Sequence, residues 1–310
     1  MTAESLTVGG TVRKRRGVRE VRKAVEGGIQ MVFLLCGTLA VGFVLLISIY
    51  LILSGLPAIR QIGLTDFLFG RVWDPTNATT GAEFGILPFI LTSIYGTAGA
   101  VVLGVPVGLL TAVYLAKIAP PKVAAAIRTA VQLLAGIPSV VYGLVGMIVL
   151  VPAIQRTFSL SSGACLLAAM IVLAIMILPS IINVAENALR AVPKEYEEAS
   201  LALGATKLET YFKVTLPAAG SGVAAAIVLG VGRAIGEAMA IIMVSGNVSN
   251  MPSIFAPVRF LTTGIVSGMG YAQVGSLYHQ ALFSIGLVLF LFIMLINVLL
   301  NVLIKKKGDA

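Results

Sequence analysis

The sequence is short of charge. Asp, Glu, Lys and Arg make up only 11% of its 310 residues, less than half of the roughly 25% that is usual in a soluble domain. Hydrophobic residues make up 58%. With so few charged side chains, an ordinary soluble globular domain is excluded.

Residues that serve catalysis and metal binding are also scarce. The chain has one histidine, His279, for which we expect no special role, and two cysteines. Cys36 and Cys165 both fall inside apolar runs, so neither a disulfide framework nor a metal-ligand spacing is visible. The motifs H-E-x-x-H and G-x-S-x-G are absent, which disfavours an intramembrane enzyme. The phosphate-binding motif G-x-x-x-x-G-K-[ST] is absent too, so we expect this chain to bind no cofactor of its own.

Long apolar runs, in contrast, fill most of the chain. Six of them are long enough to cross a hydrocarbon layer of about 30 Å as helices. The sequence therefore predicts an all-α integral membrane protein with six transmembrane helices. The predicted membrane domain covers residues 29–304, between a basic tail at 1–28 and a short tail at 305–310. The expected spans are about 29–53, 85–116, 130–152, 163–183, 218–245 and 280–304.

The net charge of +9 is explained by topology rather than by nucleic acid, because the basic residues lie at the ends of the apolar runs. Cytoplasmic loops of membrane proteins carry an excess of Lys and Arg. By this rule both termini and the loop 184–217 are predicted to be cytoplasmic in a multi-pass protein of the cell membrane. Most basic residues lie in 13–23, 117–128, 190–213 and 305–307, and the opposite side carries only Arg60, Arg71, Arg156 and Arg259.

The loop 192–217, VPKEYEEASLALGATKLETYFKVTLP, has the punctuation of two short helices. Pro193 suits the first position of a helix, and Gly204 suits a left-handed terminator. Thr206 and Glu209 have the spacing of a capping box. We therefore predict a helix–turn–helix outside the membrane, of the amphipathic kind that docks in another protein's groove.

This loop also resembles the EAA loop of ABC-importer permeases. The family pattern is Glu-Ala-Ala, three residues, Gly, nine residues, Ile, one residue and Leu-Pro. Here Ser200 replaces the second Ala and Val214 replaces Ile, whereas the spacing is intact. The matching positions are Glu198, Ala199, Ser200, Gly204, Leu216 and Pro217. The resemblance implies a type I ABC-importer permease fold in which the loop is a coupling helix that docks on the ATP-hydrolysing subunit.

Other segments are similar to the phosphate-specific importer permeases, and more to their C-type subunit than to its A-type partner. These segments are FGILPFILTSIYGT (84–97), LLAGIPSVVYGLVG (133–146), GVGRAIGEAMA (230–240) and GSLYHQALFSIGLVLF (275–290). The resemblance implies inorganic phosphate as the substrate and an extracytoplasmic phosphate-binding protein as a partner. It also implies an A-type second permease subunit and an ATP-binding subunit, expected in two copies, that holds ATP and Mg²⁺.

Arg233 and Glu237 are the only charges between Pro217 and Arg259. At this spacing a helix places them on one face, one turn apart. Ionisable groups in a membrane rarely face lipid, and Gly232 with Gly236 is expected to let another helix approach closely. We interpret the pair as part of the substrate pathway, in which the guanidinium binds a tetrahedral oxyanion. Glu237 is then expected to pair with Arg233 and compete the anion off. The resemblance implies the same role, and the alternative is a structural ion pair.

Two alternatives to a phosphate importer and one question about its partner remain open. A permease for sulfate, molybdate or phosphonate is the main one, because one arginine binds all of these oxyanions. A stand-alone transporter or channel would have no use for the helix–turn–helix at 192–217. The second membrane subunit is either a homologue or another copy of this chain.

Overall fold

The computed structural model describes residues 7–76 and 81–308, and these are mostly helical. The chain divides into two compact units, residues 1–53 and 54–310. The first unit consists of most of α1 (Thr7–Ile62), whose apolar side chains between Ile29 and Leu53 are exposed. Exposed apolar side chains on a helix of this length suit contact with lipid.

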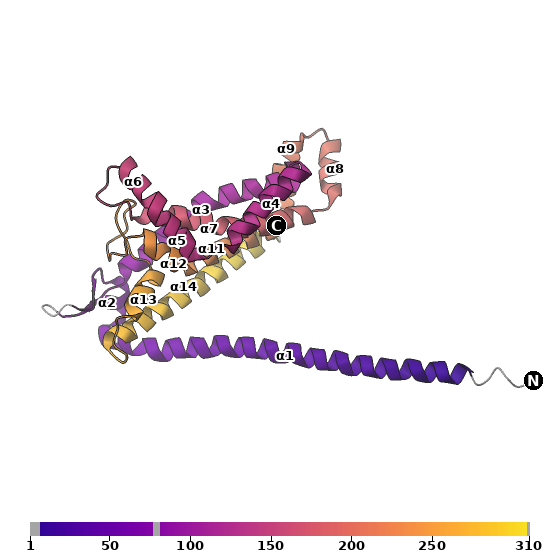
Figure 1. The fold of residues 1–310 in the computed structure, drawn as a ribbon, viewed down its shortest axis with the longest axis horizontal. Helices are drawn as coiled ribbons and strands as arrows, with labels where there is room; N and C mark the ends of the chain where they lie inside the picture. Colours follow the sequence, from indigo (N-terminus) through magenta and orange to yellow (C-terminus); the bar gives the residue numbers. More distant parts are fainter. Residues whose placement is uncertain (1–6, 77–80, 309–310) are drawn as a thin grey trace, which may run out of the picture. The chain divides into compact units, whose positions relative to one another are not determined.

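The core of the second unit is built on α3 (Leu87–Val113) and α7 (Leu166–Ala191), which pack side by side with α11 (Gly220–Gly236) against α7 (Figure 1). Glycine permits this close approach. A Cβ at Gly104 would lie 3.0 Å from Ile177 Cδ1, and a Cβ at Gly108 would lie 2.8 Å from Ile181 Cγ2. Small residues at such positions let two helix backbones approach each other.

The second span is long, and its extra length ends in a π-helical turn. Helix α3 continues through Pro106 without interruption to Val113 and is followed by the π-helical turn η1 (Tyr114–Ile118). Such turns add a residue to one turn of helix and occur often at functional sites.

The prediction of one helix over 130–152 is wrong. Helix α4 (Pro121–Gly136) ends before Pro138, and α5 (Ser139–Val145) begins after it. Ile137 is extended (φ −71°, ψ 127°), because a proline disfavours helical backbone in the residue before it. The membrane-length helix instead covers Ser139–Thr157, as α5, the π-helical turn η2 (Gly146–Leu150) and α6 (Val151–Thr157).

The fifth predicted span, 218–245, is also not one helix. It consists of α11 and the short α12 (Met239–Val244), with extended backbone at Glu237 between them. On the other side, α11 is bent by 74° from the helical segment Lys207–Ala218. Counting this bent pair as one span, the described residues contain six helices long and apolar enough to cross a membrane, and five without it.

The two ends of the second unit differ in structure. At one end lie the coupling-loop helices α8 (Lys194–Ala202) and α9 (Lys207–Thr210), and at the other lie α2 (Leu64–Phe69) and α13 (Leu261–Met269) (Figure 1). Trp73 packs at the α2 end, where its ring lies 5.4 Å from that of Phe89 and 5.6 Å from that of Phe84, centroid to centroid.

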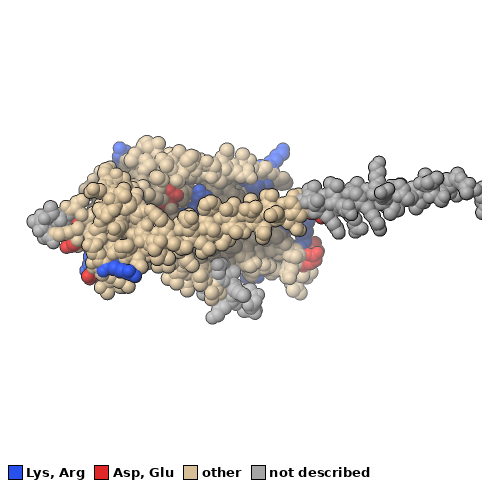
Figure 2. All heavy atoms as spheres, turned by 90° about the horizontal axis from the view of Figure 1, so that it is seen from below, with Lys and Arg blue, Asp and Glu red and all other residues tan. Residues whose placement is uncertain are grey.

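The surface carries little charge. On the face shown in Figure 2, charged residues are few and uncharged residues cover most of the surface. The remaining elements are the antiparallel strands β1 (Trp73–Asp74) and β2 (Glu83–Phe84), η3 (Tyr211–Thr215), α10 (Leu216–Ala218) and α14 (Leu277–Gly308).

Candidate functional site

Arg233 lies in the last turn of α11 with its side chain exposed, whereas the next two residues, Ala234 and Ile235, are buried. Its guanidinium Nη1 donates one hydrogen bond, of 3.2 Å, to the hydroxyl of Ser180 on α7. A positive charge suits this position, because the free carbonyls at the C-terminal end of a helix carry partial negative charge. Most of the guanidinium donors therefore remain available for a ligand.

Glu237 lies in the break between α11 and α12 and not on a helix. Its carboxylate Oε1 accepts a hydrogen bond of 3.0 Å from the backbone N–H of Ala240, in the first turn of α12. The backbone carbonyl of Glu237 accepts another, of 2.7 Å, from the Thr262 hydroxyl. Glu237 thus satisfies a free amide at the start of α12, as capping side chains do.

The prediction that Arg233 and Glu237 lie one turn apart on one helix face is therefore wrong. The i,i+4 rule requires a continuous helix, and α11 ends at Gly236. Among the ion pairs of the described residues, none joins these two side chains. Gly232 and Gly236 are weak helix formers at the end of an apolar run. They could have indicated this break, although we interpreted them as a site of close helix packing.

The helix face around Arg233 is open. A Cβ added to Gly232 or to Gly236 would meet no atom within 4 Å, so within residues 7–76 and 81–308 no helix makes the close approach expected there. An exposed guanidinium in a broken apolar helix, beside a hydroxyl, has the donors that an oxyanion requires. Ser180 was not identified from the sequence, although it is a polar residue that follows Pro179 inside an apolar run.

Arg259 was also not identified as a site residue, and two of its guanidinium nitrogens are bonded within the chain. Its Nε donates to the side-chain oxygen of Asn247 at 3.1 Å, and its Nη2 donates to the carbonyl of Asn247 at 2.7 Å. The guanidinium carbon also lies 5.7 Å from the centre of the Phe89 ring, a cation–π distance. Burial lowers the pKa of Arg259.

The coupling loop contains the two helices and the turn that the sequence predicts. Gly204 adopts the left-handed conformation (φ 87°) between α8 and α9. Thr206 and Glu209 form the predicted capping box, with the Glu209 N–H donating to Thr206 Oγ1 at 3.3 Å and the Thr206 N–H donating to Glu209 Oε2 at 3.1 Å. The hydrogen bonds from Thr206 and from Lys213 hold the pKa of Glu209 down at about 2.

The surface of the coupling loop is exposed and combines charged residues with several apolar ones. Glu198, Ala199 and Pro217 are exposed, whereas Leu216 is half-buried. Leu203 is 91% exposed, and together with its exposed apolar neighbours it forms the kind of apolar surface that marks an interaction site. Other exposed apolar residues of the loop are Tyr196, Leu201, Leu208 and Phe212.

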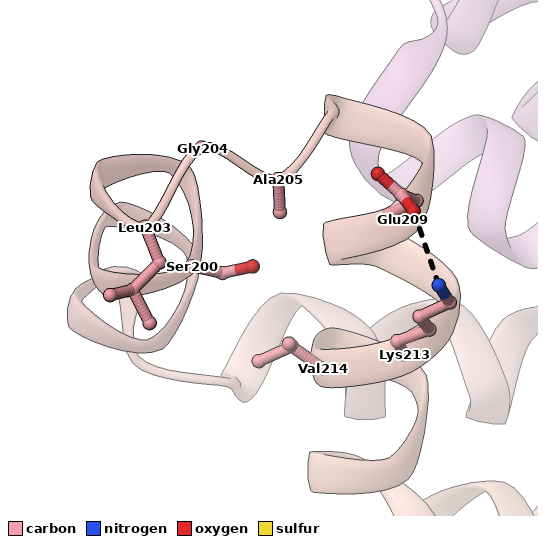
Figure 3. Close-up of a pocket in the computed structure, with 7 residues that line it drawn as sticks. All are labelled: Ser200, Leu203, Gly204, Ala205, Glu209, Lys213 and Val214. Atoms are coloured by element: carbon pink, nitrogen blue, oxygen red, sulfur yellow. Dashed lines mark hydrogen bonds and ion pairs between the residues drawn. The ribbon is translucent and has the colours of Figure 1, made fainter.

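A hollow of about 390 Å³ opens between α8 and the segment that follows α9 (Figure 3). The Ser200 hydroxyl points toward its interior and lies 2.9 Å from the Thr210 hydroxyl, which ties α8 to α9. Glu209 and Lys213 form an exposed ion pair of 3.1 Å at its rim. The hollow is lined by Ser200, Leu203, Gly204, Ala205, Glu209, Lys213 and Val214.

Two carboxylates at this end of the molecule make contacts that were not predicted from the sequence. Glu186 on α7, with its side chain 5% exposed, accepts hydrogen bonds from Arg128 Nε of α4 at 2.7 Å and from Arg190 Nε of its own helix at 2.9 Å. Glu197 on α8 joins the coupling loop to the helical bundle, because it lies 2.5 Å from Lys117 Nζ and accepts a hydrogen bond from the Thr215 hydroxyl at 3.2 Å. The Glu186–Arg128 and Glu197–Lys117 pairs join residues far apart in the sequence, which local patterns do not reveal.

Comparison with solved structures shows the fold. The crystal structure of a bacterial alginate ABC transporter, in complex with a periplasmic protein, matches with a TM-score of 0.60 at 17% identity, covering 90% of this chain and 96% of that one. An inward-facing structure of the MetNI methionine ABC transporter matches with a TM-score of 0.56 at 21% identity, covering 72% and 95%.

Sequence comparison finds nearer relatives. A Bacillus subtilis protein named "Probable ABC transporter permease protein YqgH" is 39% identical over 294 residues, which cover 93% of each chain. The phosphate transport system permease protein PstC of Pasteurella multocida is 35% identical over 265 residues, which cover 78% of this chain and 81% of that one.

The family assignment follows from a match to a family model, together with these relatives. Residues 104–307 match the model of the binding-protein-dependent transport system inner membrane component. This segment contains both the coupling loop and the broken fifth span, the two regions with the most distinctive geometry. The chain belongs to this family, and it is a multi-pass membrane permease subunit of an ABC importer.

Proposed function

We propose that this chain passes inorganic phosphate across the cell membrane as one permease subunit of an ATP-driven importer. The observation that carries the proposal is the guanidinium of Arg233, exposed at the end of α11 and held by a single hydrogen bond to Ser180. Relatives named as PstC phosphate transport permeases, at 32–35% identity, support phosphate as the substrate.

Arg233 would bind the anion through its planar fork of donors, which matches two oxygens of a tetrahedral oxyanion. A pathway also requires binding weak enough to allow release. Since the Glu237 carboxylate is already bonded to the Ala240 N–H, we no longer assign it the role of competing with the anion. We propose instead that Glu237 holds the break between α11 and α12, and that solvent exposure of Arg233 keeps the anion loosely bound.

The partners follow from the two open surfaces. The exposed apolar side chains of the coupling loop would dock on an ATP-binding subunit, present in two copies, which supplies ATP and Mg²⁺. The open face at Gly232 and Gly236 would meet a second, homologous permease subunit of the PstA type. A phosphate-binding protein would deliver the anion from outside at the α2 and α13 end.

We propose that both termini and the coupling loop are cytoplasmic, because most Lys and Arg residues lie in these segments and in 117–128. Cysteines introduced singly at Lys306 and at the exposed Arg71, two residues before Trp73, would test this in intact cells with an impermeant thiol reagent, in a background without Cys36. Labelling is expected at 71 and not at 306. Labelling at 306 would contradict the six-span topology.

The substrate is tested by uptake of radiolabelled phosphate into vesicles that contain the assembled importer. ATP-dependent uptake is expected, and excess unlabelled phosphate should abolish it while equal excesses of sulfate, molybdate or phosphonate leave most of it. Competition by sulfate or molybdate as strong as that by phosphate would instead favour a permease for one of those oxyanions. Uptake by this chain without its partners would favour a stand-alone transporter.

A further inference from the structure

One carboxylate connects three segments of the coupling-loop end. Glu197 lies on α8, Lys117 lies in η1 at the end of α3, and Thr215 lies in η3, which leads into α10 and α11. The Lys117 and Glu197 side chains are 12% and 19% exposed, and Thr215 is fully buried. The coupling helix is thus joined by one side chain both to the second span and to the segment that begins the fifth.

Burial of the Lys117–Glu197 ion pair is energetically costly, which argues that the pair does more than stabilise the fold. Taking two charges out of water costs several kcal/mol for each, and apolar side chains of similar volume often stabilise a protein as well or better. The other ion pair of the coupling loop, Lys213 with Glu209, is 73% and 47% exposed and joins two residues of the same helical segment. Only the buried pair connects the loop to a membrane span.

The segment η1 is itself joined to the rest of the bundle. The carbonyl of Leu115, two residues before Lys117, accepts a hydrogen bond of 3.1 Å from Arg190 Nη2. Arg190 is in turn paired with Glu186 on α7, which also binds Arg128 of α4. A displacement of Lys117 would therefore reach α3, α7 and α4 together.

We infer that the buried Lys117–Glu197 pair is a positioning contact through which movement of the coupling helix α8 displaces α3. The inference rests on the proposed coupling of this chain to an ATPase subunit, and it identifies which contact carries the movement. If the pair served stability alone, its charges could be removed together without effect on transport, because neither would then be left unpaired.

The decisive variant is the double substitution Lys117→Met with Glu197→Gln. It leaves no buried unpaired charge, and the glutamine still accepts a hydrogen bond from Thr215, so only the connection to η1 is lost. The matched control is Lys213→Met with Glu209→Gln, which removes the exposed pair of the same loop. The charge-reversed variant Lys117→Glu with Glu197→Lys tests whether attraction between the two sites is what matters.

Each variant is assembled into the complete importer in vesicles, and both ATP hydrolysis and phosphate uptake are measured per assembled complex. We expect the double variant to hydrolyse ATP but to take up about tenfold less phosphate per ATP, a change in the range seen when coupled residues are altered. The control should stay within about twofold of the unmodified importer. The charge-reversed variant should recover at least half of the lost uptake per ATP.

Three results would overturn the inference. One is a double variant with unchanged uptake per ATP, and another is a charge-reversed variant that assembles but stays as defective as the double variant. The third is a double variant that fails to assemble while the control assembles, which would assign the pair a folding role only. If phosphate is not the substrate, the unmodified importer itself would hydrolyse ATP without taking up phosphate, so this failure is distinguishable from failure of the inference. Uptake per ATP hydrolysed would then be measured with the competing oxyanion instead.

Discussion

Arg233 and Arg259 are two arginines in largely apolar surroundings, and the structure treats them in opposite ways. Arg259 directs two of its nitrogens to Asn247 and lies over Phe89, whereas Arg233 has one bond to Ser180 and is exposed. An arginine with most of its donors bonded within its own chain is suited to holding the fold in place. An arginine with most of its donors unbonded is suited to binding a ligand, so the contrast supports our proposal of a structural role for Arg259 and a transport role for Arg233.

The largest effect is expected from Arg233→Gln. Hydrogen bonds to a charged group contribute about 1.5–3 kcal/mol, so we expect uptake per assembled importer to fall by about tenfold to a hundredfold. Arg233→Lys should lose part of the activity, because an ammonium lacks the planar fork.

The matched control for Arg233 is Glu237→Gln, which keeps an oxygen for the Ala240 N–H. This variant should assemble and retain most of the uptake, measured in the same vesicles. If Glu237→Gln is as defective as Arg233→Gln, the two charges act together, and the separation seen in the structure does not describe the working state.

Arg259→Gln should have the converse effect. We expect it to lower the free energy of unfolding by about 2 kcal/mol, because the Asn247 carbonyl loses its charged donors. Thermal unfolding in detergent measures this loss, and the affinity for phosphate should be unchanged in the complexes that assemble. A loss of phosphate affinity without a loss of stability would instead assign Arg259 a role in transport.

Gly204→Val tests whether the coupling loop serves docking on the ATPase subunit or only the fold of this chain. A side chain in the left-handed conformation costs about 1–2 kcal/mol, and a β-branched residue resists it most. Open space surrounds Gly204, so this cost is one of backbone conformation and not of collision. The variant should insert into the membrane normally but co-purify with less ATPase subunit. Normal co-purification with normal uptake would count against docking by this loop.

The smallest effect is expected from Ser200→Ala, which restores the residue of the family pattern. Losing the hydrogen bond to the Thr210 hydroxyl should lower the free energy of unfolding by about 1 kcal/mol without changing uptake.

Ser180→Ala is the comparison for this variant, because it removes a serine hydroxyl beside Arg233. It should lower uptake severalfold with little loss of stability. Equal effects of the two serine substitutions would remove the distinction drawn between the sites.

Local signals in the sequence were sufficient for the coupling loop. Gly204, Thr206 and Glu209 act on their immediate neighbours through backbone conformation and hydrogen bonds, so their spacing alone predicts the turn and the capping box. The fifth span was harder, because the i,i+4 spacing of Arg233 and Glu237 is informative only where a helix continues. Whether it continues depended on Gly236 and on the bond from Thr262, which is distant in the sequence.

The contacts of Glu186 and Glu197 lay beyond sequence reasoning for a different reason. Each carboxylate meets a partner from another helix, and several exposed acidic residues of the chain have no such role. Burial distinguishes them, and burial depends on the packing of α3, α4, α7 and α8. In the third span, the Ile137–Pro138 dipeptide did carry a readable signal, which the long apolar run concealed.

The break after Gly236 has a consequence for how such an importer can change over time. Arg233 lies about 20 Å along α11 from its start at Gly220, at 1.5 Å per residue, and the coupling loop ends just before that start. In the proposed importer, the anion site and the ATPase docking surface would therefore share no residue and would be linked by the displacement of helices. Substitutions near Arg233 that alter which anion is bound would then leave the docking surface unchanged, so substrate specificity and ATPase coupling could evolve separately.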